Sequence, residues 1–506
     1  MDGKGIDLSN AQIRVNDGAS DQAKNGAVVI LGAGPAGLAC AYQLLASGIG
    51  RPVIVLDRAK LPGGAGASFR WKNHTLDYGP HAFHARGDAP EQLVRDLFKH
   101  EPDVLLARTK KVKVFLKGRF FKYPLQVKEA MLKFNPFVSL KIISEFLLTG
   151  VLHLLVSIPV ESFEDWGRKR FGATLYRMSF GDYTRKVWKT DPNKISRKFA
   201  AEKIQGFSFI NLVKKLLRIG GQVTEPYFQT VIYHRSGSGS LFLRLAERVR
   251  EMGGVVELEA DVKEIGMRDD SLTEVRYVKD GKEHVVPVGL LVNTIQLPAF
   301  IKLLGEAAPF ISRHHAAKLR YVSLVLVFIE FAVERAGEDN WFYLLDKEFI
   351  FNRVTEQKNL SEFTMEPGKT VLSFELTCRM GDEYWQMTDP QLYELALADC
   401  RRVPQLAKLL PQATDFLVRR APSVYEIYFK HFDNHAEVVL GYIQELRNAV
   451  TIGRRGLFLQ GDMHQSVEMG LEMGKRLAAN ERASAPALGR LKADYVREYV
   501  RYLDDY

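Results

Sequence analysis

The sequence contains very little cysteine: Cys40, Cys378 and Cys400 are the only three in a chain of 506 residues. So small and scattered a set cannot form a disulfide framework or a cysteine-based metal site, and no metal is expected. It is typical of a reducing, cytoplasmic setting. A signal peptide is also lacking, because the first 25 residues are polar and contain no apolar core segment. Residues 1–25 are therefore expected to form a loose tail.

Long runs of one charge are absent as well, although the formal charge is +10 and the isoelectric point about 9.2. The basic clusters at 110–117 and 447–455 are short and match no nucleic-acid-binding motif, so a nucleic-acid partner is not expected. The excess of positive charge suits an ordinary basic surface, an anionic small-molecule substrate or peripheral association with an anionic membrane, and these alternatives stay open. Nothing in the sequence specifies the oligomeric state.

One apolar stretch, Val138–Val160, is long enough to cross a membrane. Polar residues recur in it every four positions and form a stripe along one side of a helix: Lys141, Glu145, Thr149, His153 and Ser157. A spanning helix is therefore not expected. The spacing predicts an amphipathic helix buried in the protein, with a helix lying on a bilayer surface as the alternative.

A strand–helix–strand unit is predicted near the N-terminus. Ala27–Leu31 is a short apolar run typical of a buried parallel strand, Leu38–Ser47 has helical spacing, and Val53–Leu56 is the next buried strand. Between the first strand and the helix lies a glycine-rich turn with the sequence Gly32-Ala33-Gly34-Pro35-Ala36-Gly37. This order of elements is typical of a dinucleotide-binding domain.

Each glycine of this turn has a steric task. Gly32 permits the turn after the strand, Gly34 lets a pyrophosphate approach the backbone, and Gly37 lets the helix pack on the strand. The pyrophosphate would sit at the N-terminus of the helix, where unpaired N–H groups and the dipole favour anions. Asp57, 20 residues after Gly37, is placed to accept hydrogen bonds from a ribose diol.

The residues that follow Asp57 resemble the pattern of FAD-binding two-domain flavoproteins, in which a basic residue and two glycines follow the carboxylate. Late in the chain, Leu457–Asp462 resembles the second FAD segment, where Asp462 would hold the ribityl or pyrophosphate region. FAD is therefore the expected cofactor. Besides the first turn and Asp57, the resemblance implies these cofactor-binding residues: Arg58, Gly63, Gly64, Ala65, Gly79, Pro80, His81, Val262, Gly461, Asp462, Ser466 and Val467.

From Ala27 to Ala479, the order of motifs resembles the FAD-dependent superfamily of protoporphyrinogen oxidases, amine oxidases, phytoene desaturases and UDP-galactopyranose mutases. Asp77–His84 is similar to the mutase loop that passes near the flavin, and Phe351-Asn352-Arg353 is similar to a strand that presents an arginine to a diphosphate. Lys203 stands where mutases carry a second arginine for the diphosphate. Lysine binds phosphate without the bidentate fork of arginine, so UDP-galactose is not the expected substrate.

The resemblance implies an α/β, two-domain, Rossmann-type FAD-binding fold of the glutathione-reductase kind, with an antiparallel-sheet substrate domain and a helical insertion. The FAD domain would be discontinuous, with a helical part of the substrate domain, an antiparallel sheet and a C-terminal helix between and after its pieces. The expected bounds are 26–90, 230–300 and 455–482 for the FAD domain, 91–229 for the helical part, 301–454 for the sheet and 483–506 for the last helix. Further strands are expected at Ser323–Glu330, Trp341–Leu345, Thr370–Glu375 and Leu457–Leu459.

Several functions stay open at this point. The first is an oxidoreductase in which a small organic substrate passes a hydride to flavin N5, with His81 as a catalytic candidate. A variant of it is a desaturase or oxidase of an isoprenoid or porphyrinogen at a membrane surface. The second is a non-redox mutase of a sugar nucleotide, in which Arg353 and Lys203 would hold an anionic leaving group. A third is a flavoprotein that only binds a partner.

Overall fold

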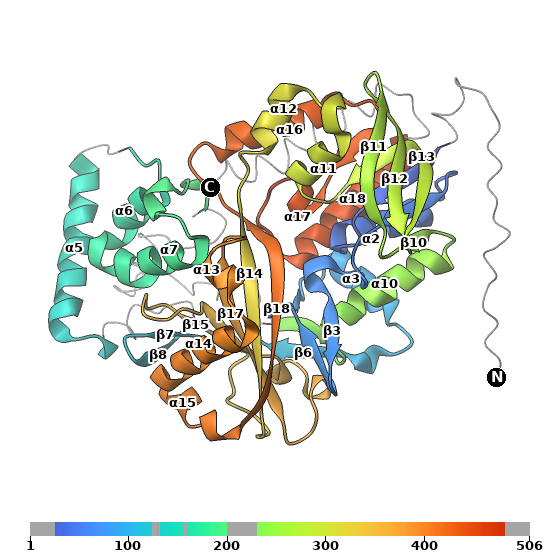
Figure 1. The fold of residues 1–506 in the computed structure, drawn as a ribbon. Helices are drawn as coiled ribbons and strands as arrows, with labels where there is room; N and C mark the ends of the chain where they lie inside the picture. The colour runs from blue at the N-terminus through green and yellow to red at the C-terminus, as the bar shows by residue number, and fades with distance from the viewer. Residues whose placement is uncertain (1–25, 124–128, 130–131, 156–158, 200–229, 481–506) are drawn as a thin grey trace.

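The computed structural model describes residues 26–123, 129, 132–155, 159–199 and 230–480. The chain forms two large sheets, with helices packed around the first and a group of helices beyond the second (Figure 1). This α/β architecture with mixed sheets confirms the predicted fold class. No helix in the described ranges is long and apolar enough to span a membrane.

The first sheet is built around β1 (Ala27–Leu31), whose residues are all buried. β1 pairs in parallel with β2 (Val53–Leu56) on one side and with β13 (Lys282–Asn293) on the other. β10 (Val255–Glu257) extends the sheet beyond β2, and β19 (Ala449–Thr451) extends it beyond β13, again in parallel. Strands buried on both faces are apolar throughout, which is why the sequence of β1 shows no alternation.

Two helices cross each other at the edge of this sheet where the cofactor turn lies. α2 (Pro35–Ala46) follows β1, and α18 (Met463–Asn480) returns to it from the end of the described chain. Their backbones come into close contact because a Cβ atom at Gly470 would lie 2.3 Å from the carbonyl oxygen of Ala36. This packing brings the first turn of α2 against the second turn of a helix that is far away in sequence.

The second sheet has the strand order β18-β14-β17-β16-β15-β7-β8. Its pairs are antiparallel except β15 with β7, which run parallel. The predicted substrate sheet therefore exists, but it is mixed. Its strands are β7 (Val112–Leu116), β8 (Arg119–Lys122), β14 (Tyr321–Phe331), β15 (Trp341–Leu344), β16 (Arg353–Glu356), β17 (Thr370–Cys378) and β18 (Ala413–Glu426).

Beyond the edge formed by β7 and β8 lie the helices α5 (Pro136–Leu155), α6 (Phe163–Tyr176) and α7 (Asp182–Trp188). They stand at the left of Figure 1, on the opposite side of the molecule from the first sheet. The side chains of Ile142 and Phe134 join Leu116 and Phe121 in a hydrophobic cluster that connects α5 to the second sheet.

Shorter elements complete the fold. The strands β3 to β6 and β9 form two small sheets between the large ones, and β11 and β12 make an antiparallel flap on β13. Their bounds are β3 Ser68–Trp71, β4 His74–Asp77, β5 Phe83–His84, β6 Leu105–Thr109, β9 Thr230–His234, β11 Asp261–Arg268 and β12 Ser271–Lys279. The remaining helices are α3 Ala89–Leu97, α10 Gly239–Glu251, α11 Leu297–Leu304, α12 Phe310–Ala316, α13 Glu383–Gln386, α14 Asp389–Arg402, α15 Pro404–Ala407, α16 Phe432–Glu445 and α17 Gly453–Gly456.

One prediction about the elements is wrong. Leu457–Leu459 is not a strand; the last strand of the first sheet is β19, and the chain then turns through α17 before it reaches these residues. Phe458 has a positive φ of 55°, which no strand tolerates. The range 91–229, expected to be mostly helical, also contains the strands β6, β7 and β8, and its bounds as part of a domain stay a prediction. The predicted N-terminal tail and C-terminal helix lie outside the described residues.

The prediction for Val138–Val160 is wrong in its orientation. α5 is not buried: Phe137, Leu140 and Leu148 are 83%, 66% and 69% exposed. Of the polar stripe, Glu145 faces inward, and its carboxylate accepts hydrogen bonds from the amide and hydroxyl of Thr174 at 2.6 and 2.8 Å.

Candidate active site

The first glycine turn has the geometry that the sequence predicts. Gly32 has a φ of 105°, a conformation open to glycine. A Cβ atom at Gly37 would lie 2.0 Å from the carbonyl oxygen of Gly32, so the helix packs directly on the turn. A Cβ atom at Gly34 would meet nothing within 4 Å, and no side chain caps the N-terminus of α2. The turn therefore leaves an uncapped helix end facing open space, as a bound pyrophosphate requires.

A second glycine turn lies against the first. The amide of Gly63 donates to the carbonyl of Ala33 at 2.7 Å, and a Cβ atom at Gly64 would lie 3.6 Å from the Cα of Gly34. The carboxylate of Asp57 ties the turns to the tip of β2, because it accepts hydrogen bonds from the amides of Ala33 at 2.7 Å and Ala59 at 2.8 Å. Asp57 thus shapes the loop, and its predicted contact with a ribose stays a prediction.

The late segment joins these turns through α18. A Cβ atom at Gly66 would lie 2.7 Å from the sulfur of Met463, the first residue of α18. Ser466 and Val467 lie in the first turns of the helix, and the amide of Ser466 donates to the carbonyl of Asp462 at 3.2 Å. The structure therefore brings Gly461, Asp462, Ser466 and Val467 to the glycine turns, although some 400 residues of sequence separate them.

Three further residues that were predicted to contact the cofactor lie in segments next to Asp57 or to the second glycine turn. Ala65 belongs to the short 3-10 turn that begins at Gly64. Arg58 follows Asp57 directly. Val262 lies at the start of β11, two residues after Ala260, whose amide donates to the carbonyl of Asp57 at 2.9 Å.

The loop Gly79-Pro80-His81 is anchored by a buried carboxylate. Asp77 ends β4 and accepts hydrogen bonds from the hydroxyls of Ser68 at 2.5 Å and Tyr233 at 2.6 Å. Burial raises the pKa of Asp77 to about 6, against the effect of these hydrogen bonds. The loop after it is therefore held between β4 and the start of α10.

Beneath this loop lies an ion pair between neighbouring strands. Nε and Nη2 of Arg353 donate to the two carboxylate oxygens of Glu375 at 2.7 and 2.6 Å. A Cβ atom at Gly79 would lie 3.3 Å from Glu375 and 3.6 Å from Arg353, and its φ of 124° is one that residues with side chains rarely adopt, so glycine is favoured above the pair. Burial opposes the charge of Arg353, but Glu375 outweighs it, and the pKa of Arg353 is raised. The predicted anion-binding arginine already has a carboxylate partner.

His81 stands in the same loop with a neutral imidazole. Burial, together with the positive charges of Arg353 and Arg454, lowers the pKa of His81 to about 4. Its Nδ1 atom is buried without a hydrogen-bond partner. Arg454 is itself paired, with its Nε 3.3 Å from Oε2 of the fully buried Glu426. An unpartnered buried nitrogen at this loop is consistent with a site that a bound group completes.

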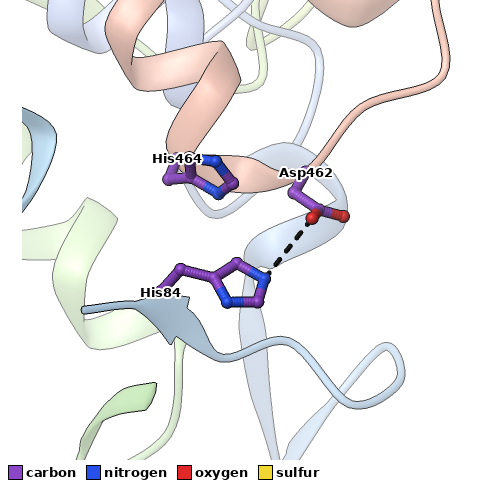
Figure 2. A group of neighbouring side chains, drawn as sticks. All are labelled: His84, Asp462 and His464. Carbon is purple, nitrogen blue, oxygen red and sulfur yellow. Dashed lines mark ion pairs between the residues drawn. The ribbon is translucent and has the colours of Figure 1, made fainter. Parts of the chain in front are cut away.

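A second group of polar side chains, His84, Asp462 and His464, gathers where the loop meets α18 (Figure 2). Nε2 of His84 lies 3.4 Å from Oδ2 of Asp462, and the rings of His84 and His464 meet edge to face. His464 is 1% exposed, and neither ring nitrogen has a hydrogen-bond partner. Burial lowers its pKa to about 3. One atom from each residue could approach a shared ligand. Because Met463, next to Asp462, packs against Gly66 of the second glycine turn, the cluster lies at the cofactor end of the site.

Sequence reasoning missed several of these residues. Glu375 brings a charge into an apolar, fully buried strand, which is a signal for a paired partner, whereas Glu426 ends a strand of mixed polarity and carried no such signal. His464 carried no signal, because its burial depends on how α18 packs. Lys203, the remaining catalytic candidate, lies outside the described residues.

Comparison with known proteins agrees with this geometry. The family model "Flavin containing amine oxidoreductase" matches residues 35–480. A phytoene desaturase (lycopene-forming) of Pseudescherichia vulneris is 26% identical over 307 residues, which is 55% of this chain and 57% of that enzyme. The matched stretch therefore spans little more than half of that relative.

Two solved structures share the fold. A reduced UDP-galactopyranose mutase superposes with a TM-score of 0.76 at 18% identity, covering 92% of this chain and 97% of the mutase. A candidate protoporphyrinogen oxidase of Exiguobacterium sp. 255-15 gives a TM-score of 0.68 at 17% identity, covering 90% and 99%.

The two glycine turns, the uncapped helix end and the strand-tip carboxylate fit FAD, and they define a two-domain flavoenzyme. The chain belongs to the flavin-containing amine oxidoreductase family, and FAD is its cofactor.

Proposed function

We propose that the protein is an FAD-dependent oxidoreductase in which a carbon–hydrogen bond of a small organic substrate gives up a hydride to N5 of the flavin. FAD, when bound, supplies the electron acceptor. The observation that carries the proposal is the charge balance at the Gly79–His81 loop. Arg353 and Arg454, whose charges act on His81, are each paired with a buried glutamate.

This balance favours redox chemistry over transfer of a diphosphate-bearing sugar. A mutase site needs cations that are free to hold an anionic leaving group. Arg353 donates from one edge of its guanidinium, through Nε and Nη2, to both oxygens of Glu375, so its charge is already balanced by a carboxylate before any diphosphate arrives. An uncharged reacting carbon, as in a polyene, an amine in its neutral form or a porphyrinogen, meets no such obstacle.

The chain's own residues then have limited tasks. Neutral His81 offers one buried nitrogen to a hydrogen bond with the substrate or the cofactor. The Arg353–Glu375 pair holds the loop in place beneath Gly79. The three cysteines are free and buried, which supports a reducing, cytoplasmic setting.

The test is to mix the yellow, oxidised protein anaerobically with a panel of amines, polyenes and porphyrinogens while the flavin absorption is followed. We expect one of these classes to bleach the flavin without added reductant. Turnover of a sugar nucleotide that requires prior reduction with dithionite, with no bleaching by any substrate of the panel, would refute the proposal in favour of the mutase reaction.

A further inference from the structure

The outward side of α5 carries six apolar side chains and forms one continuous surface, called here the α5 apolar face. Its residues are exposed by 46% to 83%, and they recur at the spacing of one helical face. They are Phe137, Leu140, Ile143, Leu147, Leu148 and Leu152. An exposed apolar surface of this kind on a water-facing helix marks a contact with another molecule or a membrane.

The helix faces this way because of a backbone break in α6. Gly172 has non-helical angles, φ 75° and ψ 165°, and a Cβ atom there would lie 3.0 Å from the Cβ of Glu145. The amide of Thr174 is satisfied instead by the carboxylate of Glu145 at 2.6 Å. The side of α5 that carries Glu145 is therefore fixed against α6, and Ile142 packs toward the second sheet. The apolar face is left outside as a consequence of specific contacts.

The chemistry of this face fits lipid better than protein. Protein interfaces are enriched in tyrosine, tryptophan, methionine and arginine, whereas this face consists of leucine, isoleucine and one phenylalanine. Lys141, 61% exposed at its side chain, lies between Leu148 and Leu152 around the helix, and a long lysine side chain can reach from an apolar surface to a phosphate layer. Residues 129–199 contain 12 lysines and arginines against seven aspartates and glutamates, a net charge of +5.

We propose that α5 docks this enzyme on the surface of an anionic bilayer, with the α5 apolar face in the headgroup and upper acyl region and basic residues at the lipid phosphates. In Figure 1, α5 lies at the outer edge of the molecule, away from the first sheet. A membrane bound to α5 would therefore lie away from the glycine turns that hold the cofactor. This proposal goes beyond the proposed function and does not depend on it.

The experiment is flotation of the purified, FAD-loaded full chain with vesicles of phosphatidylcholine containing phosphatidylglycerol, and with vesicles of phosphatidylcholine alone. We expect binding to the anionic vesicles, weakened at high salt and on the neutral vesicles. The triple variant Leu140→Gln, Leu147→Gln and Leu148→Gln should bind about tenfold more weakly or worse. Glutamine preserves helix propensity, and all three positions are exposed, so flavin content and melting temperature should not change.

A matched control is the double variant Phe310→Gln and Ile311→Gln on α12, where two apolar side chains are exposed by 73% and 54% outside α5. It should bind vesicles as the wild type does. No binding by the wild type, or equal binding by the triple variant, would overturn the proposal. The proposal would also be overturned if sedimentation showed that the wild type is a dimer that binds no vesicles and that the triple variant is a monomer. A lower melting temperature of the triple variant without vesicle binding would show that the chain itself covers the face, and would also overturn it.

Discussion

Removing one partner of the buried Arg353–Glu375 pair should destabilise the protein much more than replacing both. The side chain of Glu375 is 4% exposed and that of Arg353 is 19% exposed, and two hydrogen bonds of 2.6 and 2.7 Å join them. Either Glu375→Leu or Arg353→Met leaves an uncompensated charge in the interior, at a cost of about 3–5 kcal/mol. The double variant replaces the pair by apolar side chains of similar size, and such replacements are often neutral or stabilising.

The assay is urea unfolding of the two single variants, the double variant and the wild type, all in excess FAD so that cofactor binding is equal. From these values we expect a coupling free energy of at least about 3 kcal/mol. Asp191→Asn is the control: its carboxylate pairs with Arg185 at 3.0 Å, and both side chains are more than half exposed, so the loss should stay below about 1 kcal/mol. Additive losses in the double variant would show that the two charges are solvated separately, and the account of a neutralised arginine would fail.

Two further perturbations test the cofactor end of the site. Gly34→Val should yield colourless protein, because its side chain fills the open space that the pyrophosphate needs, whereas Gly50→Val, which also meets nothing within 4 Å, should stay yellow; equal flavin absorption in both would refute the placement. His464→Phe should reduce the acid sensitivity of folding. The pKa of His464 is lowered to about 3 in the fold, so the unfolded chain takes up a proton below about pH 6.5 while the folded chain does not. The free energy of unfolding is therefore highest above pH 6.5 and decreases as the pH falls toward 3. For His464 alone, the decrease between pH 7 and pH 5 is about 2 kcal/mol. Unfolding free energies at the two pH values should differ less in the variant than in the wild type, and an unchanged difference would contradict the assignment.

The parts of the fold that the sequence predicted are those set by neighbouring residues. The β1–α2–β2 unit and its glycine turn depend on short-range sterics: Gly32 needs its positive φ, and Gly37 must lie against the backbone of Gly32. These requirements leave a local pattern that can be recognised. That the late segment with Asp462 lies beside this turn could be predicted only from the resemblance of that segment to the second FAD segment of flavoproteins.

The errors come from contacts that sequence spacing does not contain. Leu457–Leu459 and Ala449–Thr451 are both short apolar runs, and only the second lies beside β13. The choice follows from tertiary contacts, among them the hydrogen bond from the hydroxyl of Thr451 to the carbonyl of Gly456 at 2.7 Å, which turns the chain away after the strand. For α5, the direction of the polar stripe depends on a free amide 29 residues after Glu145, created by the break at Gly172.

Two buried ion pairs determine the charge of the site near the Gly79–His81 loop. Arg353–Glu375 joins β16 to β17 within the second sheet, and Arg454–Glu426 joins α17, which packs against Ala36 of the first glycine turn, to the end of β18. Together they balance the positive charges that act on His81. A buried charge without a partner would attract water and anions into the site, and a balanced pair does not. Because transfer of a hydride from an uncharged carbon gains little from a strong fixed cation beside it, this balance suits oxidation of a neutral substrate better than departure of a diphosphate.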